Sequence, residues 1–129
     1  MNKDVKIYFF GAVFALLTIA FLLMLPKQKA LEMLVIILTA IASIYLGFAL
    51  SDGRRREIII EISAMTFFIA LAVLGIWISP YFLIAGYLLH GLWDIIHSPG
   101  IIQTEVVEWY KVLCMVYDWI MAVFIVVWM

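Results

Sequence analysis

The chain has 129 residues, of which 68% are hydrophobic and 13% charged, and its formal net charge is −1. Soluble domains average about 45–50% apolar and about 25% charged residues, so this composition predicts an integral membrane protein in contact with the lipid bilayer. The small net charge and the lack of a glycine-rich phosphate-binding loop argue against nucleic acid as a partner. The single cysteine, Cys114, excludes an internal disulfide.

Five apolar segments approach the length of about 20 residues that a membrane-spanning helix needs. They cover residues 7–25, 30–50, 57–79, 81–97 and 109–128. The sequence therefore predicts an all-α membrane bundle of five transmembrane helices, with residues 1–129 forming a single domain. The count falls to four if the last segment lies along the membrane instead of crossing it.

The first three segments have recognisable ends. The first is longer than the apolar core of about 7–15 residues in a signal peptide, and no small-residue cleavage site follows, so we expect a retained helix that ends at Pro26. The second stops at residues 51–56, where Gly53 favours a helix end and three arginines avoid lipid. The third opens with Glu57, which suits a helix N-terminus, and Glu61, which lies one turn deeper among apolar residues.

The last two segments follow two turn signals. Ser79-Pro80 makes a short turn into the fourth segment, which should end at the Ser-Pro-Gly of residues 98–100. A short loop or helix start follows, with Thr104 as a candidate N-cap. The fifth segment then carries Asp118 well inside its apolar run.

The distribution of basic residues predicts the orientation. Five antiparallel spans put six lysines and arginines on the side of the N-terminus and two on the other side. The larger set is Lys3, Lys6, Arg54, Arg55, Arg56 and Lys111, and the smaller is Lys27 and Lys29. By the positive-inside rule we expect a multi-pass protein of the cell's inner membrane, with its N-terminus in the cytoplasm and its C-terminus outside.

The fourth segment holds the most informative residues, His90, Asp94 and His97, and these two histidines are the only ones in the chain. At about 100° per residue on a helix, the three side chains share one face. Spacings of four and three residues bring side chains of adjacent turns together. This pattern suits metal ligation, a hydrogen-bonded His/Asp pair or a proton relay equally well.

Other carboxylates should meet this face, because the third helix starts, the fourth ends and the fifth starts on the same side. At about 1.5 Å rise per residue, Glu61 and Asp94 match in height to within roughly 2 Å, and His90 and Asp118 form a tier deeper in the membrane. A carboxylate inside a span costs at least about 2.5–3.5 kcal/mol. We therefore expect Asp94 and Asp118 to face the interior of the bundle.

The chemistry of these residues leaves three interpretations open: a metal site, proton or ligand handling without a metal, and a structural polar network. The candidate metal ligands are His90, Asp94, His97 and Glu61, and histidine with carboxylate suits a divalent metal such as zinc or iron. His90 and His97 are two turns apart, which favours pairs with Glu61 or Asp118 across the bundle over one shared ion. The candidate catalytic residues are His90, Asp94, His97 and Asp118, because histidine titrates near neutral pH and can exchange protons with a buried carboxyl group. Cys114 is either a soft ligand or an inert buried thiol.

A longer pattern around these residues resembles a family of small bacterial membrane proteins of unknown function. It reads Gly86-Tyr-Leu-Leu-His90-Gly-Leu-Trp93-Asp94-Ile-Ile-His97, similar to that family's Gly-x-Leu-x-His-x-x-Trp-Asp-x-x-His, and it is joined by Cys114-x-x-x-Asp118. The resemblance covers the C-terminal third and departs where family members often have His-His, since Ser98 follows His97 here. It implies no activity and directs attention to the fourth and fifth segments.

Three functions agree with the sequence. The first is a membrane metalloenzyme that acts on a lipid-soluble small molecule. The second is a transporter or channel subunit for protons or metal ions, which needs a homo-oligomer because five short helices can hardly enclose an aqueous path. The third is a structural or assembly protein with a buried polar network.

Overall fold

The computed structural model describes residues 2–97 and 102–128, and its secondary structure is entirely helical over these ranges. The helices are α1 (Lys3–Leu23), α2 (Lys27–Asp52), α3 (Arg55–Trp77), α4 (Tyr81–Ile96) and α5 (Glu108–Trp128). The prediction of an all-α bundle is confirmed. By length and composition α1, α2, α3 and α5 are able to cross a membrane, whereas α4 is apolar but shorter, at 16 residues.

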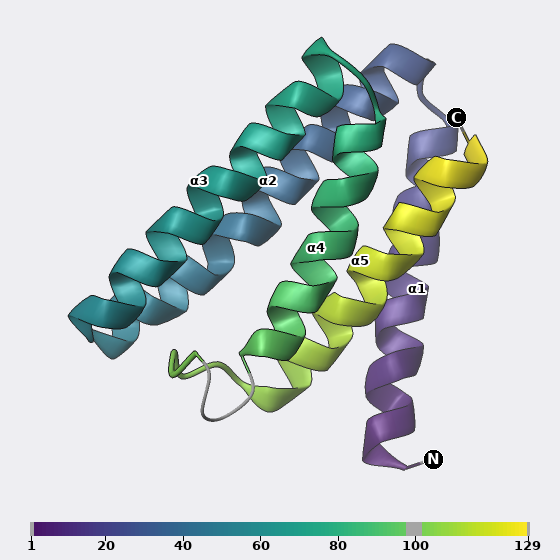
Figure 1. The fold of residues 1–129 in the computed structure, drawn as a ribbon. Helices are drawn as coiled ribbons and strands as arrows, with labels where there is room; N and C mark the ends of the chain where they lie inside the picture. The colour runs from purple at the N-terminus through teal and green to yellow at the C-terminus, as the bar shows by residue number, and fades with distance from the viewer. Residues whose placement is uncertain (1, 98–101, 129) are drawn as a thin grey trace.

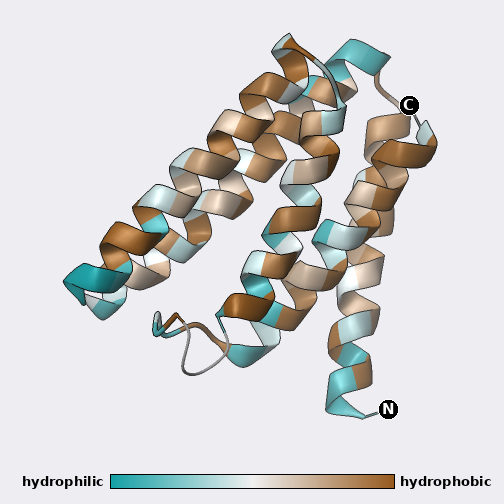
Figure 2. Ribbon diagram, viewed as in Figure 1, coloured by the Kyte–Doolittle hydropathy of each residue, from teal (hydrophilic) through white to brown (hydrophobic). Residues whose placement is uncertain are grey.

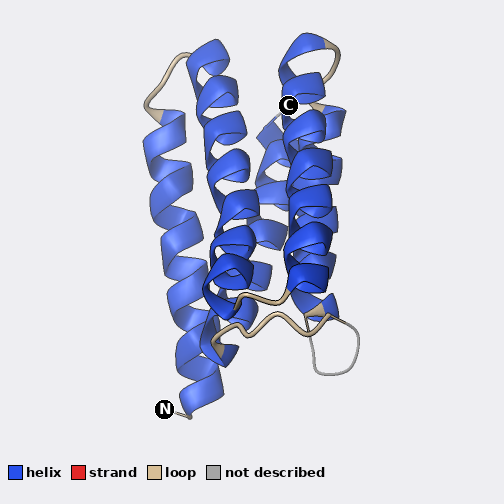
Figure 3. Ribbon diagram, turned by 90° about the vertical axis from the view of Figure 1, so that its left-hand side faces the viewer, coloured by secondary structure: helices blue, strands red, loops and turns tan. Residues whose placement is uncertain are grey.

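The helices run alternately up and down, so the two termini lie at opposite ends of the bundle (Figure 1). α2 and α3 lie side by side as one hairpin, α4 packs against α5, and α1 packs against the other side of α5. α4 thus lies between α3 and α5. The view turned by 90° shows the helices running roughly along one direction and joined by loops at the two ends of the bundle (Figure 3). This position gives the polar face of α4 partners on both sides.

The helix ends follow the sequence signals with one difference. Gly53 closes α2 in the left-handed region at φ 83°, where its N–H donates to the Ala49 carbonyl, and this conformation favours glycine. Thr104 was expected as an N-cap, but α5 begins at Glu108 and residues 102–107 form a loop. The Thr104 hydroxyl donates instead to the Glu61 carboxylate, which is buried and needs the hydrogen bond. The turn expected at residues 98–100 lies outside the described residues.

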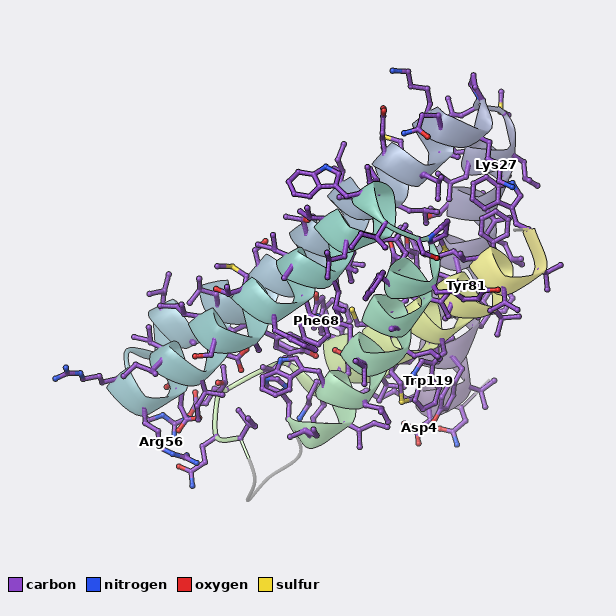
Figure 4. The ribbon with its side chains drawn as sticks, turned by 45° about the horizontal axis from the view of Figure 1, so that its top comes forward. Asp4, Lys27, Arg56, Phe68, Tyr81 and Trp119 are labelled. Atoms are coloured by element: carbon purple, nitrogen blue, oxygen red, sulfur yellow. The ribbon has the colours of Figure 1, made fainter. Side chains whose placement is uncertain are left out.

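One glycine allows α4 and α5 to approach closely. An ideal Cβ on Gly91 would lie 2.1 Å from Nε1 of Trp119, so only glycine leaves room for this indole. The indole N–H donates to the Leu88 carbonyl at 3.2 Å, and Trp119 sits where α4 and α5 meet (Figure 4). The neighbours of these two residues in the sequence, His90 and Asp118, are therefore brought face to face.

The surface is more apolar than that of a soluble protein, and the largely apolar interior also holds charged groups. The sides of the helices are largely hydrophobic and the hydrophilic residues gather toward the ends (Figure 2), and large apolar side chains such as Phe14 and Leu17 are 57% and 64% exposed. Eight polar or charged residues are at most 8% exposed: Glu57, Glu61, His90, Asp94, His97, Thr104, Lys111 and Asp118. Apolar side chains on the outside, with the ionisable groups of the spans turned to the interior, agree with a helical bundle in a bilayer.

Candidate metal centre

Four buried residues from α4 and α5 form one cluster, which we call the deep cluster: His90, Asp94, Cys114 and Asp118. Nδ1 of His90 lies 2.8 Å from Oδ2 of Asp118 and 3.8 Å from Oδ1 of Asp94. Sγ of Cys114 lies 3.9 Å from Oδ2 of Asp118. One ligand atom from each of the four residues lies within 4.8 Å of all the others, so the cluster could hold a metal ion.

Three polar atoms of the deep cluster have no hydrogen-bond partner among the described residues. They are Nε2 of His90, Oδ2 of Asp94 and Oδ1 of Asp118, and all three are buried. Each unpaired buried polar atom costs about 1–3 kcal/mol, so three in one cluster would be expensive. A proton shared by the two carboxyl groups would pair their oxygens, and so would a bound cation; imidazole, carboxylate and thiol donors together fit a divalent metal.

Tyr45 of α2 completes the surroundings of Asp94. Its side chain is fully buried, and its hydroxyl donates to Oδ1 of Asp94. Sequence reasoning missed Tyr45, because a tyrosine in an apolar helix is usually a packing residue. The sequence carried no clear signal for it: Leu38, Ile41 and Ala49 share its buried face of α2, but the residues on the other faces are mostly apolar too.

Aromatic rings separate the deep cluster from lipid on the α3 side. Phe68 points from α3 toward α4 (Figure 4), and its ring meets the His90 ring edge-on with 4.8 Å between centroids. Phe68 is 3% exposed. The low dielectric constant of such surroundings strengthens the interactions of His90 with charged partners.

His97 and Glu61 form a second site, which we call the outer pair. Nε2 of His97 is hydrogen-bonded to Oε1 of Glu61, and Nδ1 of His97 lies 2.7 Å from the Trp93 carbonyl oxygen. A carbonyl only accepts, so Nδ1 carries a proton. The bond to Glu61 then needs one further proton, held either by Nε2 or by the carboxyl group. The outer pair thus shares one proton in a buried hydrogen bond.

Tyr45 connects the outer pair to the deep cluster. Its ring stacks on the His97 ring with centroids 4.1 Å apart and an angle of 16° between the planes, while its hydroxyl donates to Asp94. A movement of His97 would therefore also move Tyr45, whose hydroxyl is hydrogen-bonded to Asp94.

The structure divides the residues that the sequence singled out between these two sites. It brings His90, Asp94 and Asp118 together and adds Cys114, whereas His97 and Glu61 contact one another. Counting residues from the helix ends matched Glu61 with Asp94 in height. The count assumed parallel helices, but α3 and α4 are inclined to one another (Figure 1), and Glu61 meets His97 instead.

The loop before α5 is attached to the start of α3. Glu57, 1% exposed, accepts from Arg56 at 2.8 Å and from the backbone N–H of Gln103 at 3.1 Å. The Arg54 guanidinium donates to the Gln103 side chain and carbonyl. Glu57 therefore does more than favour the start of α3, because it anchors the loop that places Thr104 on Glu61.

Comparison of the chain with known protein families found a match. The model of a family of unknown function, DUF6010, matches residues 7–129. The chain belongs to this family. The DUF6010 match includes every residue of the deep cluster and of the outer pair, and it supports the resemblance to an uncharacterised family seen in the sequence. No curated protein and no solved structure matches the chain.

Proposed function

We propose that this protein binds one divalent metal ion, zinc or iron, in the deep cluster and acts there on a lipid-soluble small molecule. His90, Asp94 and Asp118 are the proposed ligands, with Cys114 as a fourth donor. The observation that carries the proposal is that three of these four residues each have a buried polar atom without a hydrogen-bond partner in residues 2–97 and 102–128.

Zinc is the metal that this donor set favours. Zinc sites use imidazole nitrogen, carboxylate oxygen and thiolate sulfur in tetrahedral arrangements, whereas histidine with carboxylates alone also suits iron. A ligating histidine normally directs its other ring nitrogen to a carboxylate, carbonyl or water. Nδ1 of His90 already lies against Asp118, while Nε2 has no hydrogen-bond partner in the part of the chain that the structure describes. Asp118 can therefore serve as a ligand or as the carboxylate that orients His90.

The outer pair suggests what such a metal would do. Catalytic zinc sites keep three protein ligands and one position for water, so a catalytic centre here would use three of the four donors, and the metal would make the bound water a better acid. His97 and Glu61, with one shared proton, would supply an acid or base next to Asp94 through Tyr45. We infer an acid/base or hydrolytic role for the centre, with His90, Asp94, His97 and Asp118 as the residues that carry it.

We expect protein extracted in a mild detergent to contain about one zinc or iron per chain, because the deep cluster offers a single set of ligands. Elemental analysis of the purified protein measures this, and the double variant His90→Ala, Cys114→Ala is the matched control that should lose the metal. A metal-free protein that also fails to take up zinc or iron on incubation would contradict the proposal.

The proposed orientation places both sites in the cytoplasmic half of an inner-membrane protein. Their shared end of the bundle carries Arg54, Arg55 and Arg56, and the positive-inside rule assigns such an end to the cytoplasm. We expect a reporter fused to the N-terminus to read as cytoplasmic and one fused to the C-terminus to read as external. If both reporters read as cytoplasmic, the number of spans is even, and α5 does not cross the membrane as proposed.

A transporter subunit for protons or metal ions is the second candidate. It is favoured by two sets of hydrogen bonds, Thr104 to Glu61 to His97 and Tyr45 to Asp94, which lie next to one another because the Tyr45 and His97 rings stack. Ion flux into proteoliposomes, together with a stable homo-oligomer, would favour this function over the first.

A further inference from the structure

Two pockets meet at the first turn of α5. The larger, about 750 Å³, lies at the loop end of the bundle, and its lining includes His97, Glu105, Glu108 and Lys111. The smaller, about 130 Å³, is lined by Asp94, Ile95, Glu108, Lys111, Val112 and Met115. Glu108 and Lys111 line both pockets, so these two side chains separate the larger pocket from the smaller one that Asp94 lines.

Lys111 is held between these two pockets. Its ammonium donates to Oε1 of Glu108 at 2.8 Å and to the His97 carbonyl oxygen at 3.2 Å. The Lys111 side chain is 10% exposed, whereas that of Glu108 is 79% exposed. A buried cation thus stands between the outside and Asp94, and the carboxylate that holds it faces outward.

We propose that Lys111 is a cation gate that controls the access of a divalent metal ion to the deep cluster, an inference that rests on the proposed metal-binding function. Like charges repel, so an ion cannot approach Asp94 while the ammonium stays between the two pockets.

The gate opens when the Glu108 carboxylate, which holds Lys111 in place, binds another cation. Glu108 lines the larger pocket and its side chain is 79% exposed, so a cation from water can reach its carboxylate. A divalent ion bound to Glu108 replaces the ammonium as the partner of that carboxylate. Lys111 then keeps only the His97 carbonyl, which compensates a buried charge poorly, so the side chain turns out to water. Lys111 controls the access of the ion to the deep cluster and is not itself a metal ligand.

The experiment follows Co²⁺ binding to the full-length protein in detergent by stopped-flow absorbance, and Co²⁺ release into excess chelator. It uses the wild type, Lys111→Met, which removes the charge and keeps the chain length, and Lys111→Arg, which keeps the charge. Lys29→Met is the control, because Lys29 is 67% exposed at the opposite end of the bundle and pairs only with Glu32 among the described residues.

In Lys111→Met we expect association and release both to be at least about tenfold faster, because a charge-assisted hydrogen bond no longer has to break. Stoichiometry should stay at about one ion per chain. Lys111→Arg should stay within about threefold of the wild type, and Lys29→Met should not change.

Three outcomes would overturn the gate. Unchanged rates with one Co²⁺ per chain would leave the metal proposal standing and show that Lys111 only joins α5 to the end of α4, in which case thermal stability alone should fall. Faster Co²⁺ association with slower Co²⁺ release in Lys111→Met would mean that the Lys111 charge only weakens metal binding by repulsion and forms no kinetic barrier. Absence of Co²⁺ binding in the wild type, together with absence of zinc and iron, would overturn the metal-binding function and the gate with it.

Discussion

Replacing Asp94 with asparagine is expected to lower the metal affinity of the deep cluster by more than about 100-fold while the bundle stays folded. Changes to residues that merely support a ligand already cost about 10–100-fold, so loss of a charged ligand should cost more. Asparagine keeps the size of Asp94 and an oxygen that accepts from Tyr45. Metal content, Co²⁺ titration and the thermal midpoint measured by circular dichroism check the two parts of this expectation.

Glu105→Gln is the matched control for Asp94→Asn. It makes the same exchange of a carboxylate for an amide, but in the loop before α5, where Glu105 is exposed. Metal content and thermal midpoint should stay at wild-type values. If Asp94→Asn gave the same results as Glu105→Gln, Asp94 would be a passive polar residue and the proposed centre would lose its main ligand.

Asp118→Lys is expected to prevent stable assembly of the bundle. Asp118 is fully buried and lies 2.8 Å from Nδ1 of His90. The change removes one partner of a buried pair, which typically costs about 3–5 kcal/mol, and adds a longer side chain with a positive charge. That loss is a large part of the total stability of about 5–15 kcal/mol of a typical protein. Yield in the membrane fraction and elution in gel filtration after detergent extraction measure the effect.

Glu32→Lys is the control for Asp118→Lys, because it makes the same reversal of charge on the surface. Its side chain is 42% exposed and its ion pair with Lys29 spans 3.5 Å, so little stability depends on it. We expect wild-type yield and elution for this variant. A well-expressed, monodisperse Asp118→Lys protein would mean that the carboxylate does not face the packed contact between α4 and α5.

The properties of each helix taken separately could be predicted from the sequence. Apolar length and the turn signals predicted the helices, since the hydrocarbon of a bilayer demands about 20 apolar residues per span. Helical periodicity put His90 and Asp94 on one face. The cost of a carboxylate in lipid directed Asp94 and Asp118 inward, and both are at most 2% exposed.

Which of these inward residues meet was decided by the tertiary structure. Helical periodicity could not tell that Tyr45 reaches Asp94, or that Glu61 meets His97, because both contacts depend on how the helices are inclined and rotated about their axes. The placement of Cys114 beside Asp118 and His90 likewise depends on the close approach of α4 and α5 at Gly91. The sequence alone determined that polar groups lie inside a membrane bundle, since hydrophobicity acts on each residue separately. The tertiary structure divided them into a deep cluster and an outer pair, because hydrogen bonds and metal ligation need atoms from different helices within about 3 Å of one another or of a shared ion.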